Sequence, residues 1–156
     1  MIRLALYQVD IPQNLGTLIR LAACMDIPMD IIEPCGFPFD DKKFKRAGMD
    51  YIDYAALHRH PSWNDFLAWR NTQPAYSRII LLSTKATTPY SQFQFKPGDI
   101  LMVGRETAGV PESVHAHVDD AVIIPMYNQM RSLNVAVAAS MVVGEALRQT
   151  GHFDRA

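Results

Sequence analysis

Three polar segments follow apolar runs of strand length, and they contain the residue types that could bind a ligand or take part in catalysis. In an open α/β sheet, small ligands bind where strands end and the chain enters a loop or helix. All three segments occupy such positions, so we expect them to build one site. Their candidate residues are Asn14 and Arg20, then Glu106 between Gly104 and Gly109, then Ser132 and Asn134.

The first segment, 13–20, predicts a helix that starts near a cap at Asn14. On such a helix Arg20 points away from the apolar stripe of Leu15, Leu18, Ile19 and Ala22. A guanidinium in that place can hold a phosphate through two parallel hydrogen bonds. The alternative is a surface arginine beside an ordinary cap, which needs no ligand.

The second segment begins directly after the apolar run 99–103 and contains a glutamate between two glycines. Gly104 and Gly109 allow the backbone to approach a ligand closely or to adopt a positive φ. Their amides could then contact adenine or ribose edges. The segment lacks both the full glycine pattern of dinucleotide-binding folds and the lysine of a phosphate-binding loop, which argues against NAD and ATP.

The third segment ends the apolar run 121–124 and enters the last helix, predicted over 133–149. Ser132 is a natural helix cap, and that role explains it without a ligand. Asn134 would lie in the first turn of an otherwise apolar helix. Because a polar amide there needs a partner, the loop 104–109 is its candidate contact.

Apolar runs alternate with helical patterns along the whole chain, which predicts one α/β domain over 1–156. The strand-length runs are nearly continuous in aliphatic residues, and this favours a mainly parallel sheet with helices on both faces. The expected strands are 2–7, 29–32, 78–82, 99–103 and 121–124. Besides the two helices above, we expect helices at 40–47, stopped by Gly48, and at 62–71, capped by Ser62.

The last predicted helix is apolar over much of its circumference, so it needs burial on more than one side. Ala136, Ser140 and Gly144 recur every four residues and form a stripe of small side chains that would allow a close backbone approach. Packing against the parent sheet and packing in a homodimer both explain the stripe.

The formal net charge of −1 excludes binding of nucleic acid by bulk attraction, so any such contact must be local. The basic cluster Lys42, Lys43, Lys45 and Arg46 is the candidate. Taken alone, the same cluster is better explained as a solvated helix face.

Several other classes of protein are not expected. The apolar runs are too short to cross a bilayer, and the start of the chain does not resemble an export signal, so we expect a cytosolic protein. Cys24 and Cys35 form no paired motif, in keeping with reduced thiols. The pairs His58/His60 and His115/His117 lack a third clear ligand, so no metal is expected.

Taken together, the three segments resemble the three motifs of the SPOUT methyltransferase superfamily over almost the whole chain, from Met1 to about Gly151. The shared strings are Asn14-x-Gly16-x-x-x-Arg20, Gly104-x-Glu106-Thr107-x-Gly109-x-Pro111, and Ile124-Pro125-Met126 followed by Ser132-Leu133-Asn134. Further strings, Ile32-Glu33-Pro34 and Arg46-Ala47-Gly48-x-Asp50-Tyr51, are similar to those of the single-domain TrmL group.

This resemblance implies a homodimer with a carboxyl-terminal trefoil knot, a feature that periodicity and spacing did not indicate. It implies methyl transfer from S-adenosylmethionine to the ribose 2′-hydroxyl of the tRNA wobble nucleotide, with leucine tRNA as the expected substrate and the anticodon stem-loop as the contact. Alternatives are methylation of another tRNA position or of rRNA, or a non-catalytic RNA-binding module on the same fold.

The resemblance also assigns roles to residues. The expected cofactor-binding residues are Leu82, Thr84, Gly104, Ile124, Ser132 and Leu133, with Lys85 near the same pocket. The expected catalytic residues are Asn14, Arg20, Glu106, Ser132 and Asn134. The expected RNA contacts are Arg20, Lys42, Lys43 and Arg46, and no metal is required. Arg105 departs from the small residue that relatives often carry, and the loop 127–131 is particular to this chain.

Overall fold

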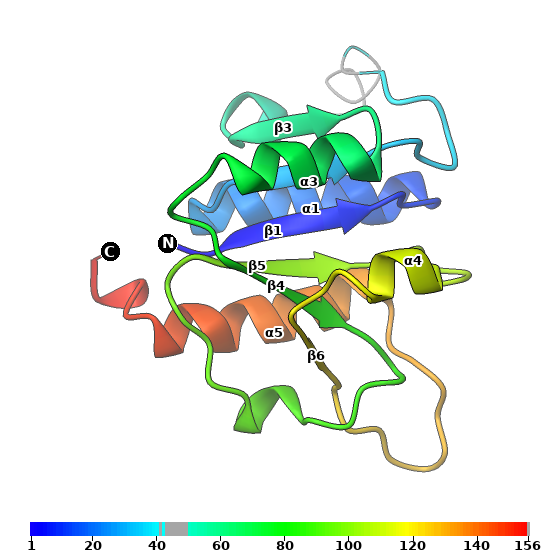
Figure 1. The fold of residues 1–156 in the computed structure, drawn as a ribbon, viewed down its shortest axis with the longest axis vertical. Coiled ribbons are helices and arrows are strands. Elements are labelled where there is room, and N and C mark those ends of the chain that lie inside the picture. Colours follow the sequence, from blue (N-terminus) through cyan, green and yellow to red (C-terminus); the bar gives the residue numbers. More distant parts are fainter. Residues whose placement is uncertain (41, 43–49, 156) are drawn as a thin grey trace.

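The structure, a computed structural model, describes residues 1–40, 42 and 50–155. Within this part of the chain, six parallel strands form one sheet in the order β3-β2-β1-β5-β4-β6. The strands are β1 (Arg3–Tyr7), β2 (Met29–Ile32), β3 (Leu57–His60), β4 (Arg78–Leu82), β5 (Asp99–Val103) and β6 (Asp120–Val122). Figure 1 shows the sheet with helices in front of it and behind it.

Helices cover both faces of the sheet, as expected. Helices α1 (Pro12–Met25) and α5 (Val135–Gln149) lie together on one face, and α3 (Trp63–Asn71) lies on the other (Figure 1). A short helix, α4 (Glu112–His115), follows β5. The apolar stripe of α1 is fully buried with α5 and one side of the sheet, while Phe66 of α3 is buried against the other side. Burial on both faces explains why the central strands are mostly aliphatic.

The expected strands all form, but β6 covers 120–122 rather than 121–124, and β3 was missed. The sequence of β3, Leu-His-Arg-His, is mostly polar, and only His60 is buried. As an edge strand it pairs only with β2, so half of it faces solvent and no apolar pattern marks it.

Two predicted helix caps were wrong. Helix α1 begins at Pro12 after Ile11, because proline already has a helical φ at the first position, so Asn14 lies inside the first turn. Helix α5 is capped by Asn134, whose Oδ1 accepts hydrogen bonds from the amides of Ala136 and Val137 at 2.8 and 3.3 Å. Ser132 is therefore free of the capping role. The predicted cap of α3 is confirmed, since Ser62 Oγ accepts from the Asp65 amide.

The helix expected at 40–47, with Lys43, Lys45 and Arg46, lies outside the described residues. Lys42 is described; it is exposed, and its amide donates to Asp40 Oδ1 at 2.9 Å. No described helix has both the length and the apolar composition of a membrane span.

Candidate active site

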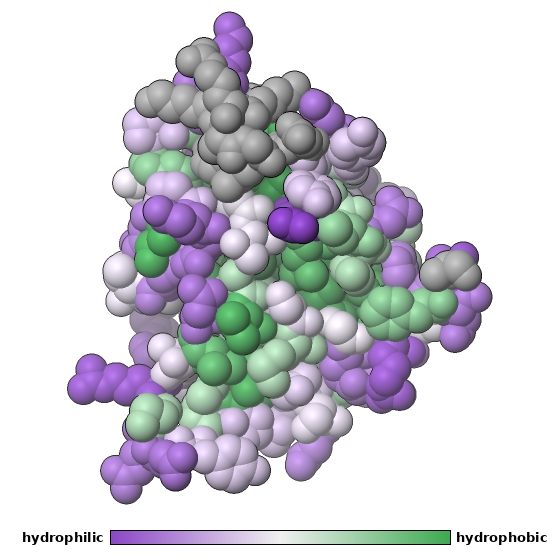
Figure 2. Space-filling view, turned by 180° about the vertical axis from the view of Figure 1, so that it is seen from behind, coloured by the Kyte–Doolittle hydropathy of each residue, from purple (hydrophilic) through white to green (hydrophobic). Residues whose placement is uncertain are grey.

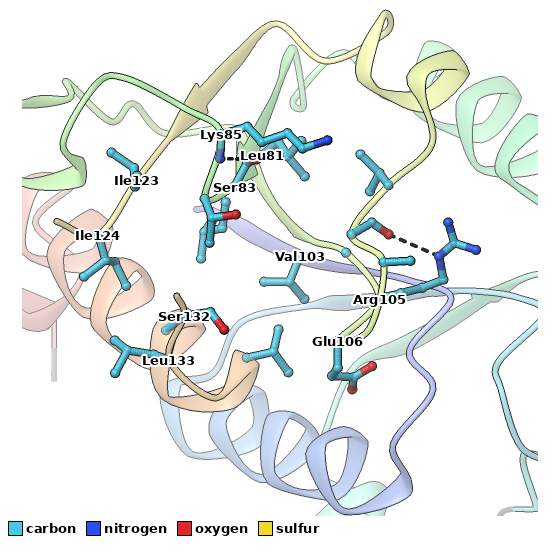
Figure 3. Close-up of a pocket in the computed structure, with 18 of the residues that line it drawn as sticks. Leu81, Ser83, Lys85, Val103, Arg105, Glu106, Ile123, Ile124, Ser132 and Leu133 are labelled. Carbon is cyan, nitrogen blue, oxygen red and sulfur yellow. Dashed lines mark hydrogen bonds between the residues drawn. The ribbon is translucent and has the colours of Figure 1, made fainter. Parts of the chain in front are cut away.

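A cavity of about 640 Å³ opens at the carboxyl ends of β4, β5 and β6. Its walls are the loops that follow these strands and the first turn of α5, as Figure 3 shows. The walls are apolar toward the sheet, where Leu81, Val103 and Val122 are buried. All the residues expected to bind a cofactor line this cavity, namely Leu82, Thr84, Gly104, Ile124, Ser132 and Leu133.

One wall is the loop 104–109, which folds back on itself. The amides of Arg105 and Gly109 each donate to the other's carbonyl oxygen, at 3.0 and 2.8 Å. Gly109 has a φ of 61°, and a Cβ on Gly104 would lie 2.8 Å from the Gly109 carbonyl carbon. Gly104 is thus required by the close approach of Gly109 within the same loop, and Gly109 has the positive φ that we expected as one of two explanations for these glycines.

A chain of side-chain amides joins the three polar segments. Asn134 Nδ2 donates to Asn14 Oδ1 at 2.9 Å, and Asn14 Nδ2 donates to Glu106 Oε1 at 3.2 Å. Because the Asn134 oxygen is occupied in capping α5, its amide nitrogen must point toward Asn14. The Asn14 oxygen then accepts from Asn134, which leaves the Asn14 amide nitrogen to donate to Glu106. Asn134 was expected to contact the loop 104–109 itself; it reaches that loop through Asn14.

Asp10, which the sequence analysis missed, completes this network. Its amide donates to Glu106 Oε2 at 2.9 Å, and its Oδ1 accepts from the Glu106 amide at 3.2 Å. The hydroxyl of Thr107 donates to Asp10 Oδ2 at 2.5 Å. The sequence offered one signal for Asp10, which is an acidic residue just beyond the first strand. Nothing in the sequence indicated that Asp10 contacts Glu106.

The two carboxyl groups influence each other's protonation. Burial raises the pKa of Glu106 above its ordinary value, and the nearby Asp10 carboxyl adds to that shift. The contact with Glu106 lowers the pKa of Asp10. Both oxygens of Glu106 accept hydrogen bonds, which favours the ionised form that the network needs. Glu106 thus fixes the position of two loops through a single carboxylate.

Arg20 lies apart from the cavity. It is exposed on α1, as expected from its position relative to the apolar stripe, but it does not line the cavity of its own chain. Arg20 is six positions after Asn14, which on an α-helix is about 9 Å along the axis and about 240° around it. Its guanidinium carbon lies 4.7 Å from the centre of the Tyr51 ring.

Apolar side chains gather on the outer face of α1 and α5, seen in Figure 2 from behind the sheet of Figure 1. Val137 and Met141 are 50% and 39% exposed, and Ile11 and Leu133 stand beside the cavity with similar exposure. The stripe of small residues is only partly on this face, because Ala136 is buried in the core. A Cβ on Gly144 would meet no atom within 4 Å.

A third potential ligand does accompany His58 and His60, contrary to expectation. Asp30 on β2 lies beside them, and the ligand atoms of the three residues are within 4.8 Å of one another. Arg3 donates to both oxygens of Asp30, at 2.6 and 3.0 Å, and His60 Nε2 lies 2.8 Å from Oδ1. The guanidinium of Arg3 thus already balances the charge of the buried Asp30 carboxylate. An ion-pair network therefore explains the cluster without a metal ion. The absence of a metal requirement stays a prediction.

The parallel sheet, the cavity at its strand ends and the polar network around that cavity define a ligand-binding α/β protein. The chain belongs to the SpoU rRNA Methylase family, whose model matches residues 1–144. This membership confirms the resemblance inferred from the three motifs.

Individual relatives are similar over almost the whole chain. The tRNA (cytidine(34)-2′-O)-methyltransferase of Beijerinckia indica subsp. indica is 60% identical, over 95% of this chain and 91% of that protein. A structure solved for the 2-OH methylation of C/U34 on tRNA is 39% identical, with a TM-score of 0.85 over 96% of this chain and 95% of that one. The AdoMet-bound rRNA methyltransferase of Sinorhizobium meliloti is 26% identical, with a TM-score of 0.82 over 94% of this chain and 56% of that one.

Proposed function

We propose that this protein transfers a methyl group from S-adenosylmethionine to the ribose 2′-hydroxyl of the wobble nucleotide in tRNA. The proposal rests on the series of hydrogen bonds from Asn134 through Asn14 to Glu106, which joins all three motif segments around one cavity. The relatives named for methylation at nucleotide 34 of tRNA support the substrate class.

The cavity suits the proposed cofactor in size and lining. About 640 Å³ falls within the range typical of small-molecule sites. Leu82, Ile124 and Leu133 provide apolar surface for an adenine ring and a methionine chain, while Ser132 and Thr84 provide hydroxyl groups at the edge. When bound, S-adenosylmethionine supplies a methyl group already activated on a sulfonium.

The residues of the chain then contribute position and charge rather than a strong base. The attacking 2′-oxygen must approach the methyl carbon in line with the bond that breaks, which requires both reactants to be held rigidly. Arg20 stays protonated in a protein, so it holds the ribose or its phosphate and balances developing negative charge. The hydroxyl proton leaves through water or phosphate. The network of Asp10, Asn14, Glu106 and Asn134 keeps the cavity loops in place.

The separation of Arg20 from the cavity within one chain supports a homodimer. Val137, Met141, Leu133 and Ile11 form an apolar surface for a second copy beside the cavity. Such a dimer would combine the Arg20 side chains and the basic residues of two protomers, which enlarges the surface available to an anticodon stem-loop. We propose in addition the carboxyl-terminal trefoil knot, a leucine tRNA substrate and a cytoplasmic location.

The basic patch tests the RNA contact. Reversing Lys42, Lys43 and Arg46 to glutamate should leave a dimer that binds S-adenosylhomocysteine but binds tRNA at least about ten-fold more weakly, since each lost phosphate contact reduces affinity. Filter binding at two salt concentrations measures this, and the salt dependence should become shallower. Unchanged tRNA affinity in a folded dimer would contradict the proposed contact.

Methylation of rRNA is the second candidate, favoured by the description of the family to which the chain belongs. Mapping ribose methylation on total tRNA and total rRNA, from cells with and without the protein, separates the two. Loss of a 2′-O-methyl group at tRNA position 34 supports the proposal. Loss only in rRNA, or at another tRNA position, replaces it, and unchanged methylation everywhere would favour a non-catalytic RNA-binding module.

A further inference from the structure

Arg20 is held against an aromatic ring from a distant part of the chain. Its guanidinium carbon lies 4.7 Å from the centre of the Tyr51 ring. This distance is within the range of a cation–π contact, in which the face of the ring attracts the positive charge. Tyr51 belongs to the short 3-10 helix η1 (Asp50–Asp53), which follows β2 and precedes β3.

The ring is carried by an anchored segment. Ile52 and Ala55 pack against the main hydrophobic core, on either side of the exposed Tyr54. The carbonyl oxygen of Tyr51 accepts hydrogen bonds from the amides of Tyr54 and Ala55, at 3.1 and 3.0 Å. Tyr51 itself is half-buried. These contacts fix the backbone that bears the ring, so the ring can act as a support for a neighbouring side chain.

Arg20, by contrast, projects from the exposed side of α1 on a long side chain with many rotamers. A flexible arginine must lose that freedom whenever it grips a phosphate or ribose. Contact with a fixed aromatic face restricts the guanidinium before the RNA arrives, and a group held in place in advance binds more tightly. The ring offers no hydrogen-bond acceptor in this contact, so the guanidinium donors still require partners, which a phosphate or ribose can supply.

We propose that Tyr51 is a positioning residue that holds Arg20 ready for the RNA. The inference rests on the proposed function, because it assumes that Arg20 contacts the substrate. Tyr51 does not line the cavity of its own chain, so we expect the ring to affect the RNA contact and not the affinity for the cofactor.

A matched pair of substitutions tests the role of the ring. Tyr51→Phe keeps the aromatic face, and Tyr51→Leu removes it while keeping apolar bulk. For Tyr51→Leu we expect kcat/KM for tRNA to fall about two- to five-fold, the size typical of an exposed cation–π contact. Affinity for S-adenosylhomocysteine should stay unchanged. Tyr51→Phe should retain nearly full activity. Thermal unfolding of both variants checks that the fold is intact, and Tyr51→Trp provides a second test of the ring if the leucine variant unfolds.

A double-mutant cycle distinguishes positioning from direct RNA contact. Tyr51→Leu should weaken tRNA binding in the native background but have no further effect in an Arg20→Ala background. An equal loss of tRNA affinity in both backgrounds would show that Tyr51 acts without Arg20, which would overturn the inference. No loss of tRNA affinity in either background would also overturn it. If Arg20→Ala alone keeps full methyl transfer, the proposed role of Arg20 fails, whatever the result for Tyr51.

Discussion

Substitution of Asn134 separates the two tasks of this side chain, which caps α5 through Oδ1 and orients Asn14 through Nδ2. Asn134→Ala removes both. Losing a cap costs about 1 kcal/mol and losing a neutral hydrogen bond about 1 kcal/mol, giving about 2 kcal/mol in total. For a chain of this length, that is a fall in the unfolding midpoint of roughly 4–8 °C.

Asn134→Asp keeps an oxygen for the cap but replaces the donor to Asn14 with a second acceptor. Whichever way the Asn14 amide then turns, its oxygen faces a carboxylate, either the new one or that of Glu106. The free energy of unfolding should fall by only about 1 kcal/mol. Methyl transfer should fall about ten- to hundred-fold, since the segments of the site are no longer held in register.

Both variants are measured in two assays. Thermal unfolding gives the loss of stability, and single-turnover kinetics give the rate of methyl transfer. Thr150→Ala is the matched control, because it removes a side-chain hydrogen bond to the Ala146 carbonyl at the other end of α5, 2.8 Å in length. It should lower the unfolding midpoint and leave the rate unchanged. A fully active Asn134→Asp variant would refute the role given to the amide chain.

Three further outcomes are expected. Arg20→Ala should reduce methyl transfer at least about hundred-fold while S-adenosylhomocysteine affinity by calorimetry stays near the native value, and a fully active variant would remove Arg20 from the mechanism. Gly144→Glu should give a folded but inactive monomer by light scattering, because the site has room for a side chain within one chain but not at the proposed interface; a fully active monomer would refute the dimer requirement. Hydrogen bonds, mainly from Arg148, lower the pKa of Glu145 from 4.5 to about 2, so its contribution to stability is present above pH 4.5 and is lost as the pH falls toward 2. The gap in unfolding midpoint between the native protein and Glu145→Gln should therefore narrow over that window, and a constant gap would contradict the assignment.

Features that depend on local pattern could be predicted from the sequence. Continuous aliphatic runs marked the central strands, since a strand buried on both faces has no polar side. Ser62 marked the start of α3, because a cap bonds to an amide only a few residues away. The three polar segments were found for a similar reason: each lies in the loop or helix that follows a strand, and parallel strands end at one edge of the sheet.

Contacts between residues distant in sequence could not be predicted and became known only from the folded chain. Asn14 and Asn134, Asp10 and Glu106, and Arg20 and Tyr51 lie far apart along the chain, and no local pattern pairs them. The edge strand β3 forms because β2 offers it hydrogen bonds, although its own residues are mostly polar. The cap of α5 is Asn134 rather than Ser132, and the same side-chain amide also donates to Asn14. The local sequence allowed several arrangements of these residues. The fold favours one of them because it brings the buried donors and acceptors within hydrogen-bond distance of each other.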